Sequence, residues 1–247
     1  MPRTLPDSLI LRVRRRIAGS KSIMAVTGAG ISAESGVPTF RAADGLWSKV
    51  DPQDYATPEG FARDPEKVWR WYDERRAEMA QAEPNRAHRA LAELELRGKR
   101  VFIATQNVDD LHERAGSTQV VHIHGSIWRI RCERDGTVEE NREVPLSPLP
   151  PCCACGALMR PDVVWFGENL PLEPVQAVQH HLLEAESNVC LVVGTEASFG
   201  YILQWVHQAK EHGAMVVTVN PRATALDSLA DLHLKGRAGD ILPRLIP

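Results

Sequence analysis

Three short polar segments carry most of the side chains that could do chemistry in this chain. The first is Gly28-Ala29-Gly30-Ile31-Ser32-Ala33, which directly follows an apolar run. It fits G-x-G-x-x-A, a form of the dinucleotide fingerprint in which glycines permit a tight turn and a close backbone approach to a pyrophosphate, and a helix N-terminus favours its charge. The pattern by itself is a weak indication, because a tight turn that binds no ligand has the same sequence.

The residues after this loop depart from the redox version of the fingerprint. That version has an acidic residue about 20 positions further on, at the end of a second strand, where it holds the ribose. Here Pro38 stops the predicted helix early, because proline disfavours helix in the residue before it, and a polar loop with aromatic residues follows over 39–47. Asp44 and Asp51 follow no strand. We therefore expect a loop over the ligand, and a chemistry other than hydride transfer.

The second and third polar segments also follow apolar runs. Gln106-Asn107-Val108-Asp109 comes after one run, and His124 comes at the very end of another, before a glycine. Ligands of open parallel sheets bind outside the carboxyl ends of the strands, where a histidine can exchange a proton near neutral pH. We predict a catalytic role for His124 and a structural role for His122. Asn and Asp also suit helix N-caps, so Asp109 has a structural alternative.

These segments need a scaffold, and the apolar runs predict one. Strands are expected at 21–27, 100–105, 120–123, 188–193 and 214–219, with a short last strand at 232–234, and helices at 85–97, 174–185 and 200–212. Near-continuous apolar strands that alternate with helices are typical of a parallel sheet covered on both faces. The predicted fold class is α/β, with a Rossmann-like, doubly wound parallel sheet.

Two segments break this alternation and are too long to be ordinary connections. Residues 47–83 contain no clear strand, and residues 128–161 are rich in proline, charge and cysteine. We expect them to build a smaller domain from a helical module and a cysteine-containing module. The remaining segments, 1–46, 84–127 and 162–247, then form the nucleotide-binding domain.

Composition excludes several classes of protein. Among 247 residues, 43% are hydrophobic and 25% charged, and the formal net charge is −3; this is an ordinary globular balance that gives no reason to expect nucleic-acid binding. No stretch approaches the roughly 18 apolar residues of a membrane span, and the first residues lack the pattern of a signal peptide. Four of the five cysteines cluster between Cys132 and Cys155, which favours a metal site and a reducing, cytoplasmic compartment over a disulfide scaffold.

In combination, the polar segments resemble those of the sirtuins, the NAD-dependent protein-lysine deacylases. The resemblance rests on Gly28–Ser32, on Gly36-Val37-Pro38-Thr39-Phe40-Arg41, on Gln106–Asp109 and on His124-Gly125. Residues Val163–Glu168 look like the substrate-binding strand of that family. The motifs cover nearly the whole chain in the right order.

The resemblance implies that NAD is consumed as a co-substrate and that an acyl-lysine protein or peptide is the partner. The acyl oxygen would attack the ribose as nicotinamide leaves, and His124 would then act as general base on a ribose hydroxyl, giving lysine and O-acyl-ADP-ribose. Asn107 and Asp109 would hold the nicotinamide ribose and carboxamide region, and Phe40 would shield the reactive carbon from water.

The resemblance also implies which other residues contact the two substrates. The NAD contacts would come from Gly28, Ala29, Gly30, Ser32, Thr39, Phe40, Arg41, Trp47, Gln106, Gly194, Thr195, Ser198, Asn220 and Ala238, the last in the final loop. The acyl-lysine contacts would come from Tyr72, Arg75, Val164, Trp165, Phe166 and Gly167. The chain departs from the family pattern at Glu196, which replaces the usual serine after Gly194-Thr195, so Ser198 is taken as its substitute.

Tyr72 and Arg75 bear on the choice of acyl group. On a helix, residues i and i+3 share a face, and a phenol beside a guanidinium can bind a carboxylate through charge-assisted hydrogen bonds. The pair is similar to the Tyr-x-x-Arg pair of class III sirtuins, which remove succinyl and malonyl groups. The alternative is an exposed arginine that pairs with Glu78 or Asp73.

The cysteine cluster predicts a structural zinc site of an incomplete kind. A zinc ribbon normally has two Cys-x-x-Cys pairs, but here one pair is reduced to Cys132, with Asp135 where its partner would stand. Cys132, Cys152 and Cys155 are the predicted ligands, with Cys153 and Asp135 as further candidates. The alternative is a small domain held by packing alone. Cys190 is expected to lie in the core.

Two other functions use the same residues. Mono-ADP-ribosyl transfer or NAD hydrolysis would share the cleavage of NAD and would yield protein-bound or free ADP-ribose. A non-catalytic NAD-binding module is harder to reconcile with His124, because binding alone needs no base.

Overall fold

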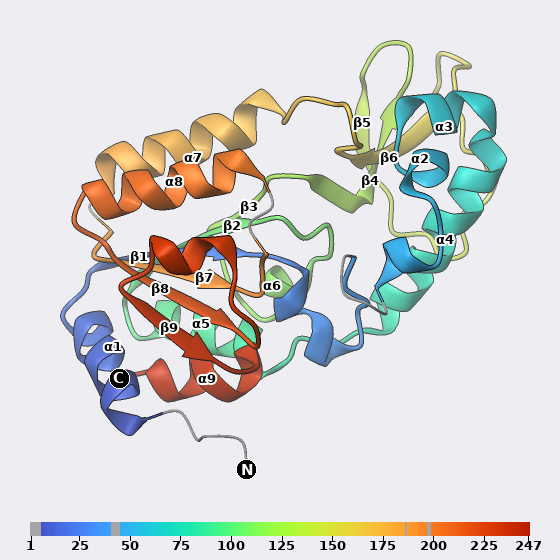
Figure 1. The fold of residues 1–247 in the computed structure, drawn as a ribbon. Coiled ribbons are helices and arrows are strands. Elements are labelled where there is room, and N and C mark those ends of the chain that lie inside the picture. The colour runs from blue at the N-terminus through green and yellow to red at the C-terminus, as the bar shows by residue number, and fades with distance from the viewer. Residues whose placement is uncertain (1–5, 41–44, 186, 197–198) are drawn as a thin grey trace.

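A six-stranded parallel sheet forms the centre of the computed structural model, which describes residues 6–40, 45–185, 187–196 and 199–247 (Figure 1). Its strands are β1 (Ser22–Thr27), β2 (Arg100–Thr105), β3 (Val120–His122), β7 (Val189–Val193), β8 (Met215–Asn220) and β9 (Leu232–Lys235). Their spatial order is β3-β2-β1-β7-β8-β9. The chain therefore reverses its direction of winding between β1 and β7, and ligands of such sheets bind at this reversal, beyond the carboxyl ends of the strands.

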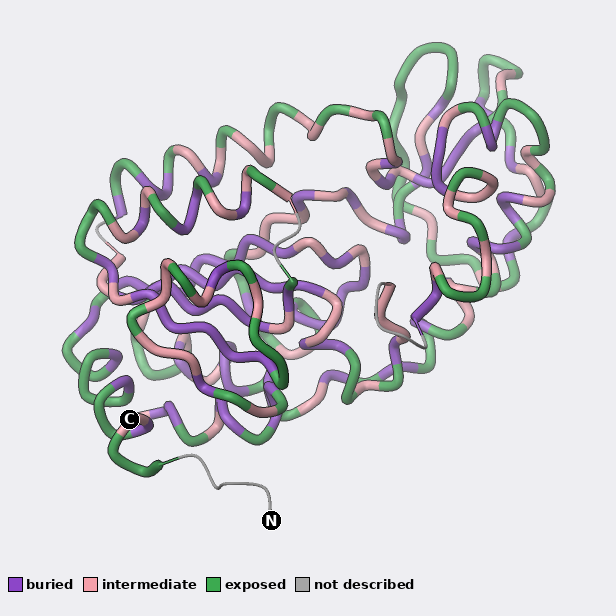
Figure 2. The backbone as a smooth tube through the Cα atoms, viewed as in Figure 1, coloured by how far each residue is buried: buried purple, intermediate pink, exposed green. Residues whose placement is uncertain are grey.

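Helices cover both faces of this sheet, as its apolar strands require. On one face lie α1 (Asp7–Ala18), α5 (Arg86–Leu96) and α9 (Ala238–Leu245), and on the other α7 (Leu172–Glu184) and α8 (Gly200–Glu211). In α1 the buried residues Ile10, Val13 and Ile17 repeat at helical spacing, which gives the helix one apolar face. Every residue of β1 and β7 is buried (Figure 2).

A second, antiparallel sheet, which we call the small sheet, lies at the right of Figure 1, with order β5-β4-β6. Its strands are β4 (Gly125–Cys132), β5 (Val138–Glu140) and β6 (Met159–Val163), and it packs with α2 (Pro52–Tyr55), α3 (Pro58–Arg63) and α4 (Pro65–Gln81) around its own core. The sheet thus reaches a few residues beyond 128–161 on each side. The division of the chain into two domains stays a prediction.

The three helices of this region start in the same way. Each has proline in its first turn, and the preceding Asp51, Thr57 or Asp64 accepts a hydrogen bond from a backbone N–H of that turn. Such caps satisfy donors that the helix leaves unpaired, and proline at the first position lacks only an N–H that has no partner there. Trp69 then ties α4 to β6, because its buried indole N–H donates to the carbonyl oxygen of Met159 at 2.7 Å.

The predicted α/β fold class is confirmed, but two local expectations are wrong. The glycine loop continues as two short 3-10 turns, η1 (Ala29–Ile31) and η2 (Ala33–Ser35), and no α-helix starts there. Ala238 is the first residue of α9 and does not lie in a loop. The remaining short elements are η3 (Leu46–Ser48), α6 (Leu111–Arg114) and η4 (Ala225–Ser228).

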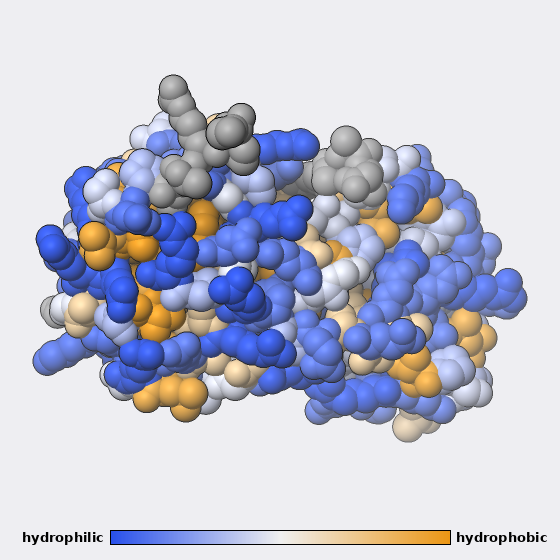
Figure 3. All heavy atoms as spheres, turned by 90° about the horizontal axis from the view of Figure 1, so that it is seen from below, coloured by the Kyte–Doolittle hydropathy of each residue, from blue (hydrophilic) through white to orange (hydrophobic). Residues whose placement is uncertain are grey.

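The surface agrees with the ordinary charge balance of the chain. The face seen in Figure 3 is mostly hydrophilic, with hydrophobic residues scattered over it. None of the helices in the described part of the chain has the length and apolar character needed to cross a membrane.

Candidate active site

The glycine loop is held against the turn that follows β7. Gly28 N–H donates to the carbonyl oxygen of Val193 at 3.0 Å, and Gly30 N–H donates to that of Gly194 at 2.8 Å. A Cβ added to Gly30 would stand 2.8 Å from both Cα and O of Gly194, and one added to Gly28 would stand 2.8 Å from Cβ of Thr195. Both glycines are therefore required for a backbone-to-backbone contact at the centre of the sheet, in addition to any approach to a pyrophosphate.

Three predicted site residues meet just behind this loop. Ser32 Oγ donates to Asp109 Oδ2 at 2.9 Å and accepts from Asn107 Nδ2 at 3.0 Å. Ser32, Asn107 and Asp109 are all buried, and they come from two segments far apart in the chain. One hydroxyl therefore fixes the orientation of both polar side chains that follow β2.

Asp109 is hydrogen-bonded both to the start of α6 and to the polar cluster. Its Oδ1 accepts a hydrogen bond from the backbone N–H of Leu111 at 3.1 Å, at the start of α6, while its Oδ2 is held by Ser32. Burial raises the pKa of Asp109 above its ordinary value, and these two hydrogen bonds act in the opposite direction. The carboxyl group thus binds the first backbone N–H of α6 and is also a fixed part of the polar cluster, while Asp110 holds the N-cap position of the helix.

The two histidines at the end of β3 and just after it are held by adjacent carbonyl groups. Nδ1 of His124 lies 3.0 Å from the carbonyl oxygen of Gln106, and Nδ1 of His122 lies 3.0 Å from that of Asn107. Nε2 of His122 pairs with Glu113 at 2.6 Å. Burial lowers the pKa of His122, but the hydrogen bond and charge of Glu113 outweigh it, so the pKa is raised overall. His122 is thus tied to α6, in agreement with a structural role.

Two residues that contact this cluster escaped the sequence analysis. Nε2 of His88 lies 3.4 Å from Ser32 Oγ, and Nδ1 of His88 accepts from the backbone N–H of Asn85 in a capping box of α5. The spacing Asn85-x-x-His88 before an apolar helix was the available signal. The second residue is Tyr201, whose hydroxyl group is hydrogen-bonded to Nε2 of His124.

A second group of predicted residues meets at the carboxyl ends of β2, β7 and β8. Gln106 Nε2 donates to Thr195 Oγ1 at 2.9 Å, and Asn220 Nδ2 donates to the carbonyl oxygen of Thr195 at 3.2 Å. Ala238 is buried, and the N–H of Gly239 next to it donates to Glu34 at 2.7 Å. Arg41 and Ser198 lie outside the described residues.

Aromatic side chains line the side of the small sheet. Trp47 lies 5.4 Å from Phe40, 5.8 Å from Trp71 and 5.9 Å from Phe166, measured between ring centroids. Leu46 N–H donates to the carbonyl oxygen of Thr39, which closes the loop that carries Phe40. The loop after the fingerprint is therefore anchored on an aromatic cluster.

The segment after β6 runs close to His124. Val164 N–H donates to the carbonyl oxygen of His124 at 2.9 Å, and Phe166 N–H donates to that of Ala56. Trp165 is buried, and Gly167 is exposed with φ +87°. The predicted acyl-lysine strand thus lies between the histidine and the helices of the small sheet.

Tyr72 and Arg75 lie on α4 with different partners. The hydroxyl group of Tyr72 is buried and accepts from the indole N–H of Trp165 at 2.9 Å. Arg75 pairs with Glu78 at 2.9 Å and with Glu74 at 3.4 Å. The pairing of Arg75 with Glu78 is the alternative that the sequence left open.

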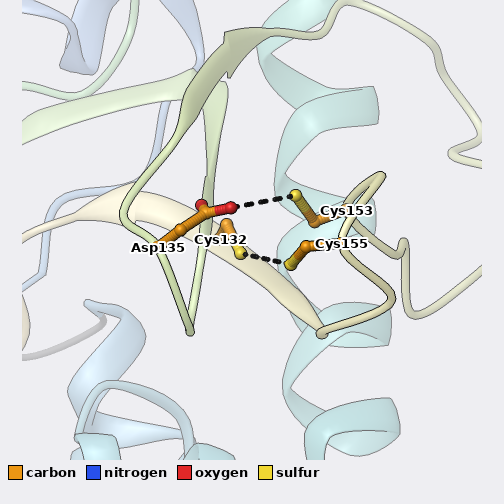
Figure 4. Close-up of side chains that lie close together, drawn as sticks. All are labelled: Cys132, Asp135, Cys153 and Cys155. Atoms are coloured by element: carbon orange, nitrogen blue, oxygen red, sulfur yellow. Dashed lines mark hydrogen bonds between the residues drawn. The ribbon is translucent and has the colours of Figure 1, made fainter.

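The cysteine cluster brings together one carboxylate and three thiols (Figure 4). Ligand atoms of Cys132, Asp135, Cys153 and Cys155 all lie within 4.8 Å of one another. The two thiols of Cys132 and Cys155 are 3.5 Å apart. Cys152 is exposed and lies outside the group, and its backbone bridges to that of Leu158. Neighbouring side chains of an extended segment lie on opposite sides of the backbone, which agrees with the presence of Cys153 in the group. Of the predicted ligands, Cys132 and Cys155 are therefore in the group, and Cys153 takes the place of Cys152.

The donor set of this group fits zinc. A tetrahedral ion with Zn–S bonds of about 2.3 Å places its sulfur atoms about 3.8 Å apart, and zinc accepts carboxylate oxygen as well as thiolate. The backbone N–H of Thr137 lowers the pKa of Asp135 to about 2, and the backbone N–H of Ala157 lowers the pKa of Cys155. Asp135 is thus ionised and Cys155 is biased toward thiolate, the forms that bind a metal. For Cys153, the backbone N–H of Cys155 lowers the pKa, but burial and the thiols of Cys132 and Cys155 raise it overall to about 11, so this thiol must lose its proton when the metal binds.

Comparison with known proteins identifies relatives over nearly the whole chain. Residues 28–199 match the model of the Sir2 family. An NAD-dependent protein deacylase 2 from Pyrobaculum aerophilum is 49% identical over 237 residues, which cover 96% of this chain and 94% of the relative. An NAD-dependent protein deacylase 1 from Archaeoglobus fulgidus is 44% identical over 236 residues, 95% of this chain and 96% of the relative.

Solved structures agree with these sequence relatives. A Sir2 homologue in complex with NAD shares 44% identity at a TM-score of 0.88, covering 95% of this chain and 91% of the other. A mutant Sir2 homologue in complex with ADP-ribose shares 43% identity at a TM-score of 0.90, covering 95% of this chain and 94% of the other.

Proposed function

Because the chain belongs to the Sir2 family, we propose that it is an NAD-dependent protein-lysine deacylase. It consumes NAD and an acyl-lysine protein or peptide, and it releases nicotinamide, lysine and O-acyl-ADP-ribose. The relatives named as NAD-dependent protein deacylases cover this chain almost from end to end, so the proposal applies to the chain as a whole.

The observation that carries this proposal is the setting of His124. A carbonyl oxygen can only accept a hydrogen bond, so the contact with Gln106 places the proton of the neutral imidazole on Nδ1. Nε2 is then the proton acceptor, and its partner is the hydroxyl group of Tyr201. A base of this kind beyond the ends of parallel strands supports deprotonation of a ribose hydroxyl, a step that NAD binding alone does not need.

The polar cluster behind the glycine loop supports a positioning role. Asn107 and Asp109 are both fixed by Ser32, so their remaining hydrogen-bonding capacity has a defined direction before substrate arrives. Such preorganisation avoids the cost of ordering side chains during the reaction. We assign Asn107 and Asp109 to the nicotinamide ribose and carboxamide region, and Phe40 to the exclusion of water.

For the acyl group, we propose removal of both acetyl and the acidic succinyl and malonyl groups. The hydroxyl group of Tyr72 accepts from Trp165, so its own O–H proton can be donated to a carboxylate. The side chain of Arg75 is only 14% exposed and is already paired with carboxylates of Glu78 and Glu74. A succinyl carboxylate would replace the carboxylate of Glu78 as the partner of Arg75. Because both are carboxylates, Arg75 would exchange one ion pair for another of the same kind.

Zinc would serve as a structural ion in this protein. Held by Cys132, Asp135, Cys153 and Cys155, it would tie the end of β4 to the turn before β6 and supply no chemistry to the reaction. A cluster of reduced thiols is stable in a reducing compartment, so we propose that the protein works in the cytoplasm.

The test uses the purified protein with NAD and two matched peptides, one carrying acetyl-lysine and one carrying succinyl-lysine. Mass spectrometry should detect deacylated peptide and O-acyl-ADP-ribose, and His124→Ala should abolish both. Free ADP-ribose or ADP-ribosylated protein, without deacylated peptide, would instead identify an NAD hydrolase or a mono-ADP-ribosyltransferase. Absence of every product would leave an NAD-binding module and reject the proposal.

A further inference from the structure

Tyr201 contacts the imidazole of His124, the proposed catalytic base. It lies in the first turn of α8, and its hydroxyl group is hydrogen-bonded to Nε2 of His124. The ring is held by packing: it stacks on Phe199 with centroids 5.5 Å apart and planes 15° apart, and it contacts Trp205 at 5.1 Å. The position of the hydroxyl group therefore depends on several contacts of the aromatic ring, and only in part on the hydrogen bond itself.

The direction of this hydrogen bond follows from the other nitrogen of the ring. Nδ1 of His124 carries the proton, because its partner is the carbonyl oxygen of Gln106. Nε2 therefore offers a lone pair, and the hydroxyl group of Tyr201 is the donor. The same lone pair must accept the proton of a ribose hydroxyl during the reaction. A nitrogen lone pair accepts one such bond at a time, so Tyr201 and the co-substrate compete for it.

We propose that Tyr201 is a positioning residue that occupies the proton acceptor of His124 in the resting enzyme, and that the ribose of NAD must displace its hydroxyl group. This inference rests on the proposed function, because it takes His124 to be the base. Until a ribose arrives, Tyr201 keeps the imidazole in the orientation that the reaction needs. Because the hydrogen bond between Tyr201 and His124 must be broken first, the nicotinamide-side ribose binds more weakly than its own contacts with the protein would allow.

Tyr201→Phe removes the hydroxyl group and keeps the aromatic ring, so the stacking on Phe199 is retained. A net hydrogen bond to a neutral group corresponds to roughly a three- to tenfold change in an equilibrium constant. We expect the variant to bind ADP-ribose about three- to tenfold more tightly in isothermal titration calorimetry. Binding of ADP, which lacks the second ribose, should not change.

Kinetics and a second background separate this role from a general effect on structure. In the deacylation assay, the KM for NAD should fall by a similar factor while kcat stays the same, because a displaced Tyr201 takes no part in the chemistry. In a His124→Ala background, Tyr201→Phe should no longer change ADP-ribose affinity. Tyr55→Phe, which removes a phenol hydroxyl group in the region of the small sheet, is the matched control and should leave ADP-ribose affinity unchanged.

Several results would overturn the inference. Unchanged ADP-ribose affinity, or an equal gain for ADP and ADP-ribose, would show that Tyr201 does not compete with the ribose. A large loss of kcat would show that the hydroxyl group takes part in the reaction. If wild-type protein forms no O-acyl-ADP-ribose, the proposed function fails, whereas the ADP-ribose titration still reports on the competition.

Discussion

Ser32→Ala is the most direct perturbation of the polar cluster, because it removes one hydroxyl group and little volume. The serine is fully buried. Its Oγ is the shared partner of Asn107 Nδ2 at 3.0 Å and Asp109 Oδ2 at 2.9 Å. The methyl group of alanine can replace neither bond, and the space gained is too small for a water molecule. The variant therefore leaves Asn107 Nδ2 and Asp109 Oδ2 without these short hydrogen bonds, and it also removes the longer 3.4 Å contact of the hydroxyl group with Nε2 of His88.

The expected cost follows from this count. A buried polar group without a partner costs about 1–3 kcal/mol. Asp109 keeps the N–H of Leu111 on its other oxygen, so the two losses together should lower the free energy of unfolding by about 2–4 kcal/mol. Domains are typically stable by only about 5–15 kcal/mol, so this is a large fraction of the total.

Ser117→Ala is a matched control. Ser117 is also buried, but its hydroxyl group has no hydrogen-bond partner among the residues that the structure describes. Its replacement should change the free energy of unfolding by less than about 0.5 kcal/mol. Urea unfolding of both variants and of wild-type protein, with equal m-values, measures the difference.

A pH series and an activity assay sharpen the same test. The Ser32 hydroxyl group opposes the rise in the pKa of Asp109 that burial causes, so its removal should raise that pKa further. The deficit of the variant should then shrink as pH falls from 7.5 toward 4.5, since a protonated Asp109 no longer needs the hydroxyl group as a donor. Deacylation should drop on the order of tenfold or more as the two side chains lose their orientation. If Ser32→Ala is no less stable than Ser117→Ala, the reasoning is refuted.

Three further predictions concern the acyl group, the metal and the buried histidines. Arg75→Ala should reduce desuccinylation at least tenfold more than deacetylation, because only the succinyl group has a carboxylate to pair; equal losses in kcat/KM on matched peptides would exclude the acyl-carboxylate role. Purified protein should contain one zinc per chain by metal analysis, and Asp135→Ala should lose the ion to a chelator faster than wild-type protein, whereas Cys152→Ala should not. Similar rates for the two variants would remove Asp135 from the ligand set. Burial lowers the pKa of His88 to about 4 from an ordinary 6.5, so the unfolded chain takes up a proton first as pH falls. The stability present above pH 6.5 is then lost toward pH 4, by about 2 kcal/mol at pH 5 for this group. His88→Gln should make the urea midpoint depend less on pH between pH 7.5 and 5. Part of the dependence should remain, because burial also lowers the pKa of His181 to about 4 and that of His112 well below its ordinary value. An unchanged slope would contradict the buried neutral state of His88.

The parallel sheet could be predicted from the sequence because its strands are buried on both faces. Runs such as Val189–Val193 are apolar at every position, a pattern typical of strands that are covered on both faces of the sheet. The antiparallel strands β4 and β6 escaped notice, since they carry Arg129, Arg131 and Arg160 among their apolar residues. Arg160 is almost fully buried and pairs with Glu168, which lies beyond the end of the strand, so the alternation pattern of the strand does not reveal this compensation.

The positions of the candidate site residues could be predicted where one motif supplies one residue. They were harder to predict where the choice between neighbouring residues depends on the conformation of a turn. Gln106, Asn107, Asp109 and His124 follow strand ends and meet as a parallel sheet requires. In the Cys152-Cys153-Ala154-Cys155 run, the Cys-x-x-Cys spacing favours Cys152, but the backbone bridge of Cys152 to Leu158 points its neighbour to the cluster instead. Tyr201 could not be predicted from the sequence, because no local pattern in α8 indicates a contact with a residue 77 positions earlier.

The path of the chain separates the residues proposed to bind the acyl-lysine from those proposed to bind the adenosine half of NAD. The segments that build the small sheet and its helices leave the parallel sheet after β1 and after β3, whereas everything from β7 onward stays with the parallel sheet. Tyr72, Arg75 and the 163–168 segment belong to the excursions, while Gly194, Asn220 and Ala238 belong to the uninterrupted last part. On this proposed assignment, substitutions at the residues for the acyl group need not disturb those for the adenosine half of NAD, so one lineage can change the modification it removes while it keeps the same co-substrate.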